Sequence, residues 1–337
     1  MRDSALAPTP IFPRLRTLVV ATSIATLSCA QHNSGTAQRT GIGGLSRDQA
    51  LAELRRQGVE FNEQSFLRSI GEEKPALVNL FLVAGVNPNS NEMGGITALM
   101  IAAGLRRPGP NTGGCIDGII HPCYSIAKKT TQADLDIVRS LIKGGADVQA
   151  RDGDGDTALH KAAIGGNLEV AKILIANGAD VNTSNHYGTT PLMLAGETSM
   201  AELLVANGAM VSNKDTHLSP ALLNAASAGY LNTLRFLISK GADIRSRGSQ
   251  GTTALMQAAS GGHVEILDFL LDRGVEADVQ DAGGYSALMY AAFNGRANCV
   301  ELLLKRGANR ALTNRAGETA SAIATKRKFA SIVKLLE

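Results

Sequence analysis

Two cysteines and a histidine stand close together in the segment GGCIDGIIHPC, residues 113–123. Cys115, His121 and Cys123 are residue types that bind zinc or a haem-type iron, and two nearby cysteines in an exported protein can also form a disulfide. A structural zinc site normally takes four ligands at tighter spacing. We therefore expect a Cys115–Cys123 disulfide and no metal or other cofactor, and a three-ligand metal site or two free thiols remain the alternatives.

Other groups that could carry chemistry are few. The run DGDGD, Asp152–Asp156, looks like the start of a calcium loop, but Ala163 stands where the closing glutamate of such a loop belongs. No serine, cysteine or lysine lies in a recognisable activating motif, and no glycine-rich phosphate loop follows a strand pattern. We therefore expect that the protein is not an enzyme.

The amino-terminal segment has the pattern of an export signal. Arg14 and Arg16 precede the apolar run TLVVATSIATLSCA, residues 17–30, which is too short for an ordinary membrane-spanning helix. We predict a signal peptide over 1–30. Residues 26–29, TLSC, resemble a bacterial lipoprotein box that would lipidate Cys29, with ordinary cleavage after Ala30 and a retained anchor as alternatives. The protein is then periplasmic or lipid-anchored to an envelope membrane.

The overall composition is that of a folded protein built from small apolar side chains. Hydrophobic residues make up 44% and charged residues 19% of the 337-residue chain, whereas aromatic residues make up 4% and tryptophan is absent. Residues 31–44 are polar and small and predict a flexible linker. The net charge of +3 argues against a nucleic-acid partner.

An internal repeat dominates the rest of the chain. The motifs TALHKAA, TPLMLA, PALLNAA, TALMQAA and SALMYAA begin at residues 157, 190, 220, 253 and 286, which are 33, 30, 33 and 33 residues apart. Each motif is followed by an apolar helix pattern that ends at a glycine, as in LIANGADVN, residues 174–182. The copy that begins at residue 190 lacks three residues between its two helix patterns.

These motifs resemble those of ankyrin-repeat proteins, and the resemblance covers about residues 45–337. It implies an all-α solenoid of stacked helix-turn-helix repeats with β-turn fingers, which binds proteins and has no catalytic activity. We divide this part into a capping helix and a degenerate first repeat (45–92), repeats with an insertion at about 104–131 (93–317), and a carboxy-terminal capping repeat (318–337). The cysteine segment belongs to the insertion.

Three further residues have structural interpretations. His160 occupies the motif position where members of the ankyrin family use histidine to hold the turn, and methionine stands there in most other copies of this chain. His263 is expected to begin a second helix. Cys299 falls at an apolar helix position and is expected to be a buried small hydrophobe.

The resemblance also indicates where a partner would bind, because ankyrin proteins hold partners with finger tips and the inner face of the first helices. We expect Tyr285, Tyr290 and Phe293 to contribute most, since aromatic residues dominate interface energetics. The residues at matching positions are Arg151, Asp154, Lys161, Tyr187, Leu194, Asn224, Arg247, Gln257, Tyr285, Tyr290 and Phe293.

We therefore predict a monomeric, non-enzymatic scaffold of the cell envelope that binds a protein partner and meets a membrane only through an anchor at Cys29. Two alternatives remain. One is a metal- or redox-active protein that uses Cys115, His121 and Cys123. The other is a secreted effector or immunity-type binder.

Overall fold

The structure is a computed structural model that describes residues 44–104, 130–215 and 220–337. Within these ranges the regular elements are helices, a single 3-10 turn (Ser249–Gly251) and three isolated antiparallel bridges. The α-helices are α1 (Arg47–Arg56), α2 (Glu63–Gly71), α3 (Pro75–Ala84), α4 (Ala98–Ala102), α5 (Gln132–Lys143), α6 (Ala158–Ile164), α7 (Leu168–Ala176), α8 (Pro191–Leu194), α9 (Thr198–Ala206), α10 (Ala221–Ala228), α11 (Leu231–Ser239), α12 (Ala254–Gly261), α13 (Val264–Asp272), α14 (Ala287–Phe293), α15 (Ala297–Lys305), α16 (Ala320–Lys326) and α17 (Ala330–Leu336).

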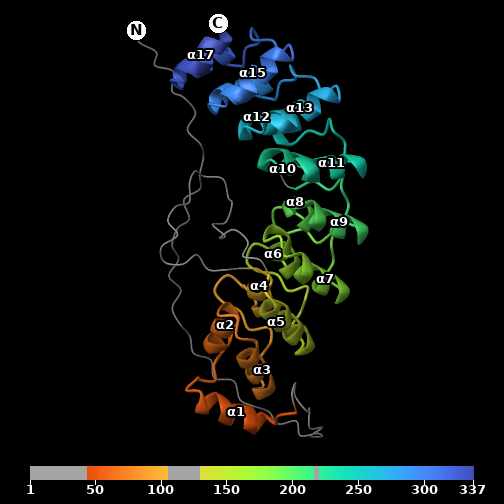
Figure 1. Ribbon diagram of the computed structural model, residues 1–337, viewed down its shortest axis with the longest axis vertical. Helices are drawn as coiled ribbons and strands as arrows, with labels where there is room; N and C mark the ends of the chain where they lie inside the picture. Colours follow the sequence, from red (N-terminus) through yellow and green to blue (C-terminus); the bar gives the residue numbers. More distant parts are fainter. Residues whose placement is uncertain (1–43, 105–129, 216–219) are drawn as a thin grey trace, which may run out of the picture. The chain divides into compact units, whose positions relative to one another are not determined.

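These helices form two stacks (Figure 1). The first helices of the pairs, from α2 to α16 in even numbers, each contact the first helix of the next pair. The second helices, from α3 to α17 in odd numbers, stack in the same way, although α11 and α13 meet through the side chains of Arg235 and Phe269, and α1 packs on α3 as a lone second-type helix. The all-α stacked fold expected from the sequence is therefore confirmed for the described residues.

The motif threonines and serines begin the first helices, as expected. The hydroxyls of Thr253 and Ser286 accept hydrogen bonds from the backbone N–H groups three residues later, at 3.3 and 3.4 Å. Such a cap satisfies a helix donor that has no partner within the helix. A capping box formed by Ser46 and Gln49 begins α1.

The glycines at the ends of the second helices adopt left-handed backbone conformations. Gly178 has a φ angle of 89° and Gly307 one of 84°. This conformation is open to glycine at little cost and ends the helix.

The three residues missing from the fourth helix pair shorten its first helix. The helix α8 has four residues, and its C-cap Ala195 is extended, with a φ angle of −70° and a ψ angle of 104°. The next first helix, α10, has eight residues. The first helix of this repeat is therefore little more than one turn long.

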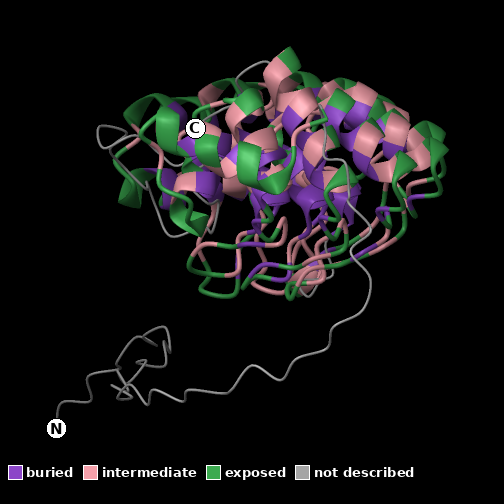
Figure 2. Cartoon of the chain, turned by 90° about the horizontal axis from the view of Figure 1, so that it is seen from below, coloured by how far each residue is buried: buried purple, intermediate pink, exposed green. Residues whose placement is uncertain are grey.

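The core lies between the two stacks of helices. Figure 2 shows the buried residues concentrated there, with exposed residues on the outer sides of the helices and on the loops. Alanine pairs such as Ala258 and Ala259 are fully buried in the first helices. Leucines such as Leu267 and Leu270 are equally buried in the second helices. Small side chains in the first helices let neighbouring repeats approach closely.

Neighbouring helix pairs share a recurring contact. The side chain of the residue just before a second helix packs over a glycine of the preceding pair. A Cβ atom built on Gly229, Gly262 or Gly295 would lie 2.6 to 2.9 Å from the side chain of His263, Arg296 or Phe329, respectively. His263 and Arg296 also hydrogen-bond backbone carbonyl groups of the preceding first helix, at 2.9 and 3.1 Å. The structural interpretation of His263 is confirmed.

The loops that precede the first helices, the fingers, are joined to one another through the backbone. The N–H group of His186 donates to the carbonyl of Asp154 at 2.9 Å, and that of Arg315 donates to the carbonyl of Gly283 at 3.0 Å. Each bond spans neighbouring repeats. These fingers are thus connected to their neighbours and are not independent loops.

Candidate protein-binding surface

Most of the residues predicted to bind a partner have accessible side chains. The finger-tip residues Arg151, Asp154, Tyr187 and Arg247 are exposed, and so is Phe293 on α14. Partly buried side chains among the predicted residues are those of Leu194, Asn224, Gln257, Tyr285 and Tyr290.

Lys161 is the exception, and the expectation that it is exposed was wrong. Its side chain is 2% exposed, and its Nζ lies 2.7 Å from Oδ2 of Asp152 and 2.6 Å from Oδ2 of Asp156. The helix pattern placed Lys161 on the accessible side of α6, but the preceding finger carries two carboxylates that draw the ammonium group back under the loop. A charge pair of this kind is a structural feature of the finger.

Burial and the ion pairs shift the pKa values of Lys161 and Asp156 in opposite directions. Burial by itself lowers the pKa of Lys161, but hydrogen bonds and charge interactions with Asp152 and Asp156 outweigh it and raise that pKa. Burial raises the pKa of Asp156, yet Lys161 and the amide of Asn185 lower it overall. Lys161 and Asp156 therefore both stay charged near neutral pH.

The aspartates of the DGDGD run take part in the ion pairs with Lys161 and in hydrogen bonds within the finger. Asp152 accepts backbone hydrogen bonds from Asp154 and Asp156 at 3.0 and 2.9 Å through Oδ1, while its Oδ2 faces Lys161. An ammonium group thus stands where a calcium loop would need a cation. Among the described residues, no group of three or more His, Cys, Asp or Glu side chains is placed to hold a metal ion.

His160 holds the turn as expected. Its Nδ1 accepts from the backbone N–H of Thr157 at 3.1 Å, and its Nε2 lies 3.0 Å from the carbonyl oxygen of Thr189 in the next finger. The side chain is fully buried. Burial lowers the pKa of His160, so the neutral ring is favoured.

The exposed finger-tip side chains form hydrogen bonds with neighbouring fingers. Arg151 donates to the carbonyl oxygen of Ser184 in the following finger at 2.6 Å. The hydroxyl of Tyr187 lies 3.4 Å from Oδ1 of Asp154. Tyr187 nevertheless keeps 42% of its surface exposed. These contacts fix the orientation of the tips before any partner arrives.

Near the carboxy-terminal end, an aspartate positions two tyrosines. Asp281 accepts the backbone N–H groups of Gly283 and Tyr285 at 2.8 Å each through Oδ1, and the Tyr290 hydroxyl donates to its Oδ2 at 2.7 Å. The rings of Tyr285 and Tyr290 lie with centroids 5.6 Å apart. Burial and the adjacent Asp281 raise the pKa of Tyr290, which keeps the phenol protonated as a donor.

Phe293, at the end of α14, meets basic residues at the end of α16. The guanidinium of Arg327 lies 4.4 Å above the Phe293 ring, and its Nε donates to the Phe293 carbonyl at 3.2 Å. Lys326 donates to Glu318 at 2.5 Å, and this hydrogen bond raises the pKa of Lys326. We call this region the α14–α16 surface, and it comprises Tyr285, Tyr290, Phe293, Lys326, Arg327 and the adjoining Lys328.

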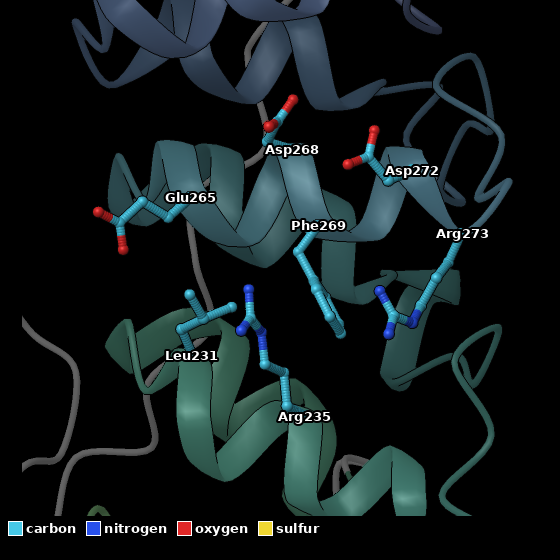
Figure 3. Close-up of a pocket in the computed structure, with 7 residues that line it drawn as sticks. All are labelled: Leu231, Arg235, Glu265, Asp268, Phe269, Asp272 and Arg273. Atoms are coloured by element: carbon cyan, nitrogen blue, oxygen red, sulfur yellow. The ribbon is translucent and has the colours of Figure 1, made fainter.

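A groove on the second helices was missed by the sequence reasoning (Figure 3). It encloses about 610 Å³ and is lined by Leu231, Arg235, Glu265, Asp268, Phe269, Asp272 and Arg273. The Phe269 ring lies between two guanidinium groups, with Arg235 at 4.8 Å and Arg273 at 3.7 Å from its centroid. The spacing of Phe269 and Arg273, four residues apart, was a signal that could have indicated this pair.

The charged groups of the groove are largely paired within the protein. Arg306 from α15 forms ion pairs with both Asp268 and Asp272. Phe269 itself is 8% exposed, as expected for a residue that faces a neighbouring repeat. We therefore assign the groove to packing between repeats and not to the binding site.

Cys299 is buried in α15 with 1% of its surface exposed, which confirms the expectation. Burial raises the pKa of its thiol to about 11 from the usual 9.0, and the nearby Arg296 offsets only a small part of this shift. Such a thiol is almost entirely protonated at neutral pH, and the thiolate is the reactive form.

We expect iodoacetamide to modify Cys299 in the folded protein at pH 8 at least about a hundredfold more slowly than in the unfolded protein, because two pKa units change the thiolate fraction by that factor. Mass spectrometry of the tryptic peptide ANCVELLLK, residues 297–305, measures this. Equal rates in the folded and guanidinium-unfolded protein would contradict the burial of the thiol.

Some predictions fall outside the described residues. These concern Cys29, Cys115, His121 and Cys123, together with the signal peptide and most of the insertion. Among the described residues, none of the helices is both long and apolar enough to span a membrane.

Comparison with known proteins agrees with the repeat geometry. A family model described as ankyrin repeats (3 copies) matches residues 126–215, 196–281, 222–314 and 273–337. Among solved structures, the ankyrin repeat domain of human ASB11 is similar, with 27% sequence identity and a TM-score of 0.54. That match covers 60% of this chain and 92% of the other. Comparison with curated protein sequences gives no significant match.

Proposed function

Because this chain belongs to the ankyrin-repeat family, whose repeats are generally protein–protein interaction modules, we propose that it is a non-enzymatic scaffold that binds a protein partner. The finger tips and the first helices form the binding face, with the α14–α16 surface as its main contact. The observation that carries this proposal is the exposed Phe293 ring, 39% accessible and fixed by Arg327.

The α14–α16 surface suits binding because its aromatic side chains are held in place before a partner arrives. Tyr290 is fixed by its hydrogen bond to Asp281, and Phe293 by the stacked Arg327. Ordering a side chain at an interface costs conformational entropy, and preformed contacts reduce that cost. Aromatic and arginine side chains are also the types that most often dominate binding energy.

The place of action belongs to the same proposal. The basic residues Arg14 and Arg16, followed by the apolar residues 17–30, support export, and the TLSC box supports a lipid anchor at Cys29. We place the protein as a monomer in the bacterial cell envelope. Its partner is therefore to be sought among envelope proteins.

We expect Phe293→Ala to weaken partner binding by about tenfold, or 1.4 kcal/mol, because Phe293 is proposed as a main contact and truncation of the few residues that dominate an interface costs more than 1 kcal/mol. Immobilised full-length protein is incubated with solubilised envelope proteins, and retained proteins are quantified by mass spectrometry. The affinity of each retained partner is then measured by titration.

The matched control is Tyr230→Ala. Tyr230 is 46% exposed, comparable to Phe293, but it precedes α11, two helix pairs before the pair of α14, where its ring covers Gly196. Circular dichroism confirms that both variants are folded. Retention of every partner with unchanged affinity by the Phe293 variant would contradict the assignment of the interface.

A further inference from the structure

Charge is distributed very unevenly along the repeats. Residues 290–337 contain nine Lys and Arg against three Asp and Glu, whereas residues 130–289 contain eleven Lys and Arg against eighteen Asp and Glu. The chain as a whole is nearly neutral, but its central part is acidic and its carboxy-terminal part is basic. The α14–α16 surface contains part of this basic excess.

The basic side chains of the α14–α16 surface lie beside its aromatic side chains. Lys326 has a side chain that is 75% exposed, and Arg327 and Lys328 are also exposed. Arg327 lies against the Phe293 ring. Positive charge and an exposed apolar ring are thus presented together.

Lys328 is held in an unusual backbone conformation. Its φ angle is 64°, in the left-handed region, where the preceding helix pairs have Gly262 and Gly295 at the equivalent positions. In those pairs a Cβ atom would meet Arg296 or Phe329 of the following pair. Lys328 is exposed, so its Cβ is tolerated, but a non-glycine residue still bears backbone strain there.

We propose that the α14–α16 surface binds an acidic segment of the partner protein. Carboxylates of that segment pair with Lys328 and with the exposed ammonium group of Lys326, which also keeps its ion pair with Glu318, and an apolar side chain of the segment packs on Phe293. This inference rests on the proposed protein-binding function and specifies the chemistry of the partner.

The acidic central repeats favour a short protein segment over a nucleic acid or a membrane as the ligand of the α14–α16 surface. A nucleic acid or an anionic membrane would extend past the basic part and meet the acidic repeats, where like charges repel it. A short acidic peptide stays within the basic part. Opposite charges across an interface favour the correct partner and speed encounter.

The test is a selection of random dodecapeptides displayed on phage against immobilised full-length protein. We expect the enriched peptides to contain an excess of Asp and Glu over the unselected library. The strongest binder is then synthesised with a fluorescein label and titrated by fluorescence anisotropy. Its affinity should fall as salt is raised from about 50 to 300 mM, because added ions screen exposed charge pairs.

Two double variants of equal net charge provide the comparison. Lys326→Ala with Lys328→Ala removes charge from the surface, whereas Lys305→Ala with Lys334→Ala removes the same charge from exposed positions on the second helices α15 and α17. We expect the first pair to weaken peptide binding by about tenfold or more and the second by less than about twofold. Equal effects of the two pairs would overturn the inference.

Other outcomes separate this inference from the proposed function. Neutral or basic peptides that still require Phe293 would overturn the acidic partner but leave protein binding intact. A selection without any Phe293-dependent peptide would overturn both. Phosphatidylglycerol vesicles and a single-stranded oligonucleotide are tested in parallel, and binding of either that depends on Lys326 and Lys328 more strongly than the acidic peptide does would also overturn it.

Discussion

Replacement of Lys161 by alanine is expected to lower the free energy of unfolding by about 3 to 5 kcal/mol, because removal of one partner leaves the others buried without a counter-charge. The Nζ atom of Lys161 lies within 2.7 Å of both Asp152 and Asp156, and the side chain is 2% exposed. Guanidinium denaturation followed by circular dichroism measures the loss.

The pH dependence of this loss follows from the directions of the pKa shifts. The lowered pKa of Asp156 gives stability that is present above its ordinary value of 3.8 and is lost as the pH falls through the lowered folded value. The raised pKa of Lys161 gives stability that is present below its ordinary value of 10.5 and is lost as the pH rises through the raised folded value. The difference between wild type and variant should therefore be largest between these two ordinary values.

Two controls separate the buried network from a general effect of charge. Lys172→Ala breaks an exposed pair with Glu169, whose atoms are 2.6 Å apart, and such pairs contribute about 0 to 1 kcal/mol. A triple variant, Lys161→Met with Asp152→Asn and Asp156→Asn, removes all three charges and should recover part of the stability. A Lys161 variant no less stable than the Lys172 variant would contradict the buried network.

Gly284→Ala is expected to lower the free energy of unfolding by about 3 kcal/mol, because a left-handed residue with a Cβ atom costs roughly 1 to 2 kcal/mol and steric overlap adds to it. The φ angle of Gly284 is 80°, and a Cβ atom there would lie 2.9 Å from the backbone N of Arg315 and from the Cα of Asn314. Backbone atoms cannot rotate away as a side chain can. The finger must move and lose its bond from Arg315 N to Gly283 O.

Gly317 offers a matched control one repeat later. Its φ angle is 74°, but a Cβ atom built on it meets no heavy atom within 4 Å. Gly317→Ala should therefore cost only the conformational part, about 1 to 2 kcal/mol. Denaturation curves give both costs, and hydrogen exchange at the Arg315 amide reports whether the fingers separate. Equal costs for the two variants would refute the role of the finger contact.

The repeat period made most of the fold predictable, because every copy carries the same local signals. The caps at Thr253 and Ser286 and the left-handed Gly178 and Gly307 follow from residue type at a fixed position. Signals of this kind act within one repeat and can be read without knowledge of the tertiary structure. The prediction that three residues are missing between the two helices of the fourth pair was wrong in place, because the connection between α8 and α9 keeps its usual length and α8 itself is shortened.

The candidate site was less predictable, because its properties depend on contacts between elements. Lys161 occupies an accessible position in the helical pattern, and only the fold of the preceding finger shows that Asp152 and Asp156 bury it. The placement of Arg327 over Phe293 joins residues 34 positions apart. The exposure of Phe293 was correctly expected, but the basic side chain that holds its ring was not anticipated.

The left-handed Lys328 also bears on self-assembly. In the preceding helix pair a glycine leaves room for a side chain of the following pair, as Gly295 does for Phe329. Lys328 places a side chain and a charge at the equivalent position, which disfavours stacking of a second copy on this end in the way that one repeat stacks on the next. Repeated contacts between unlike surfaces produce open-ended filaments. A single residue thus opposes polymerisation and supports the monomeric state proposed for this chain.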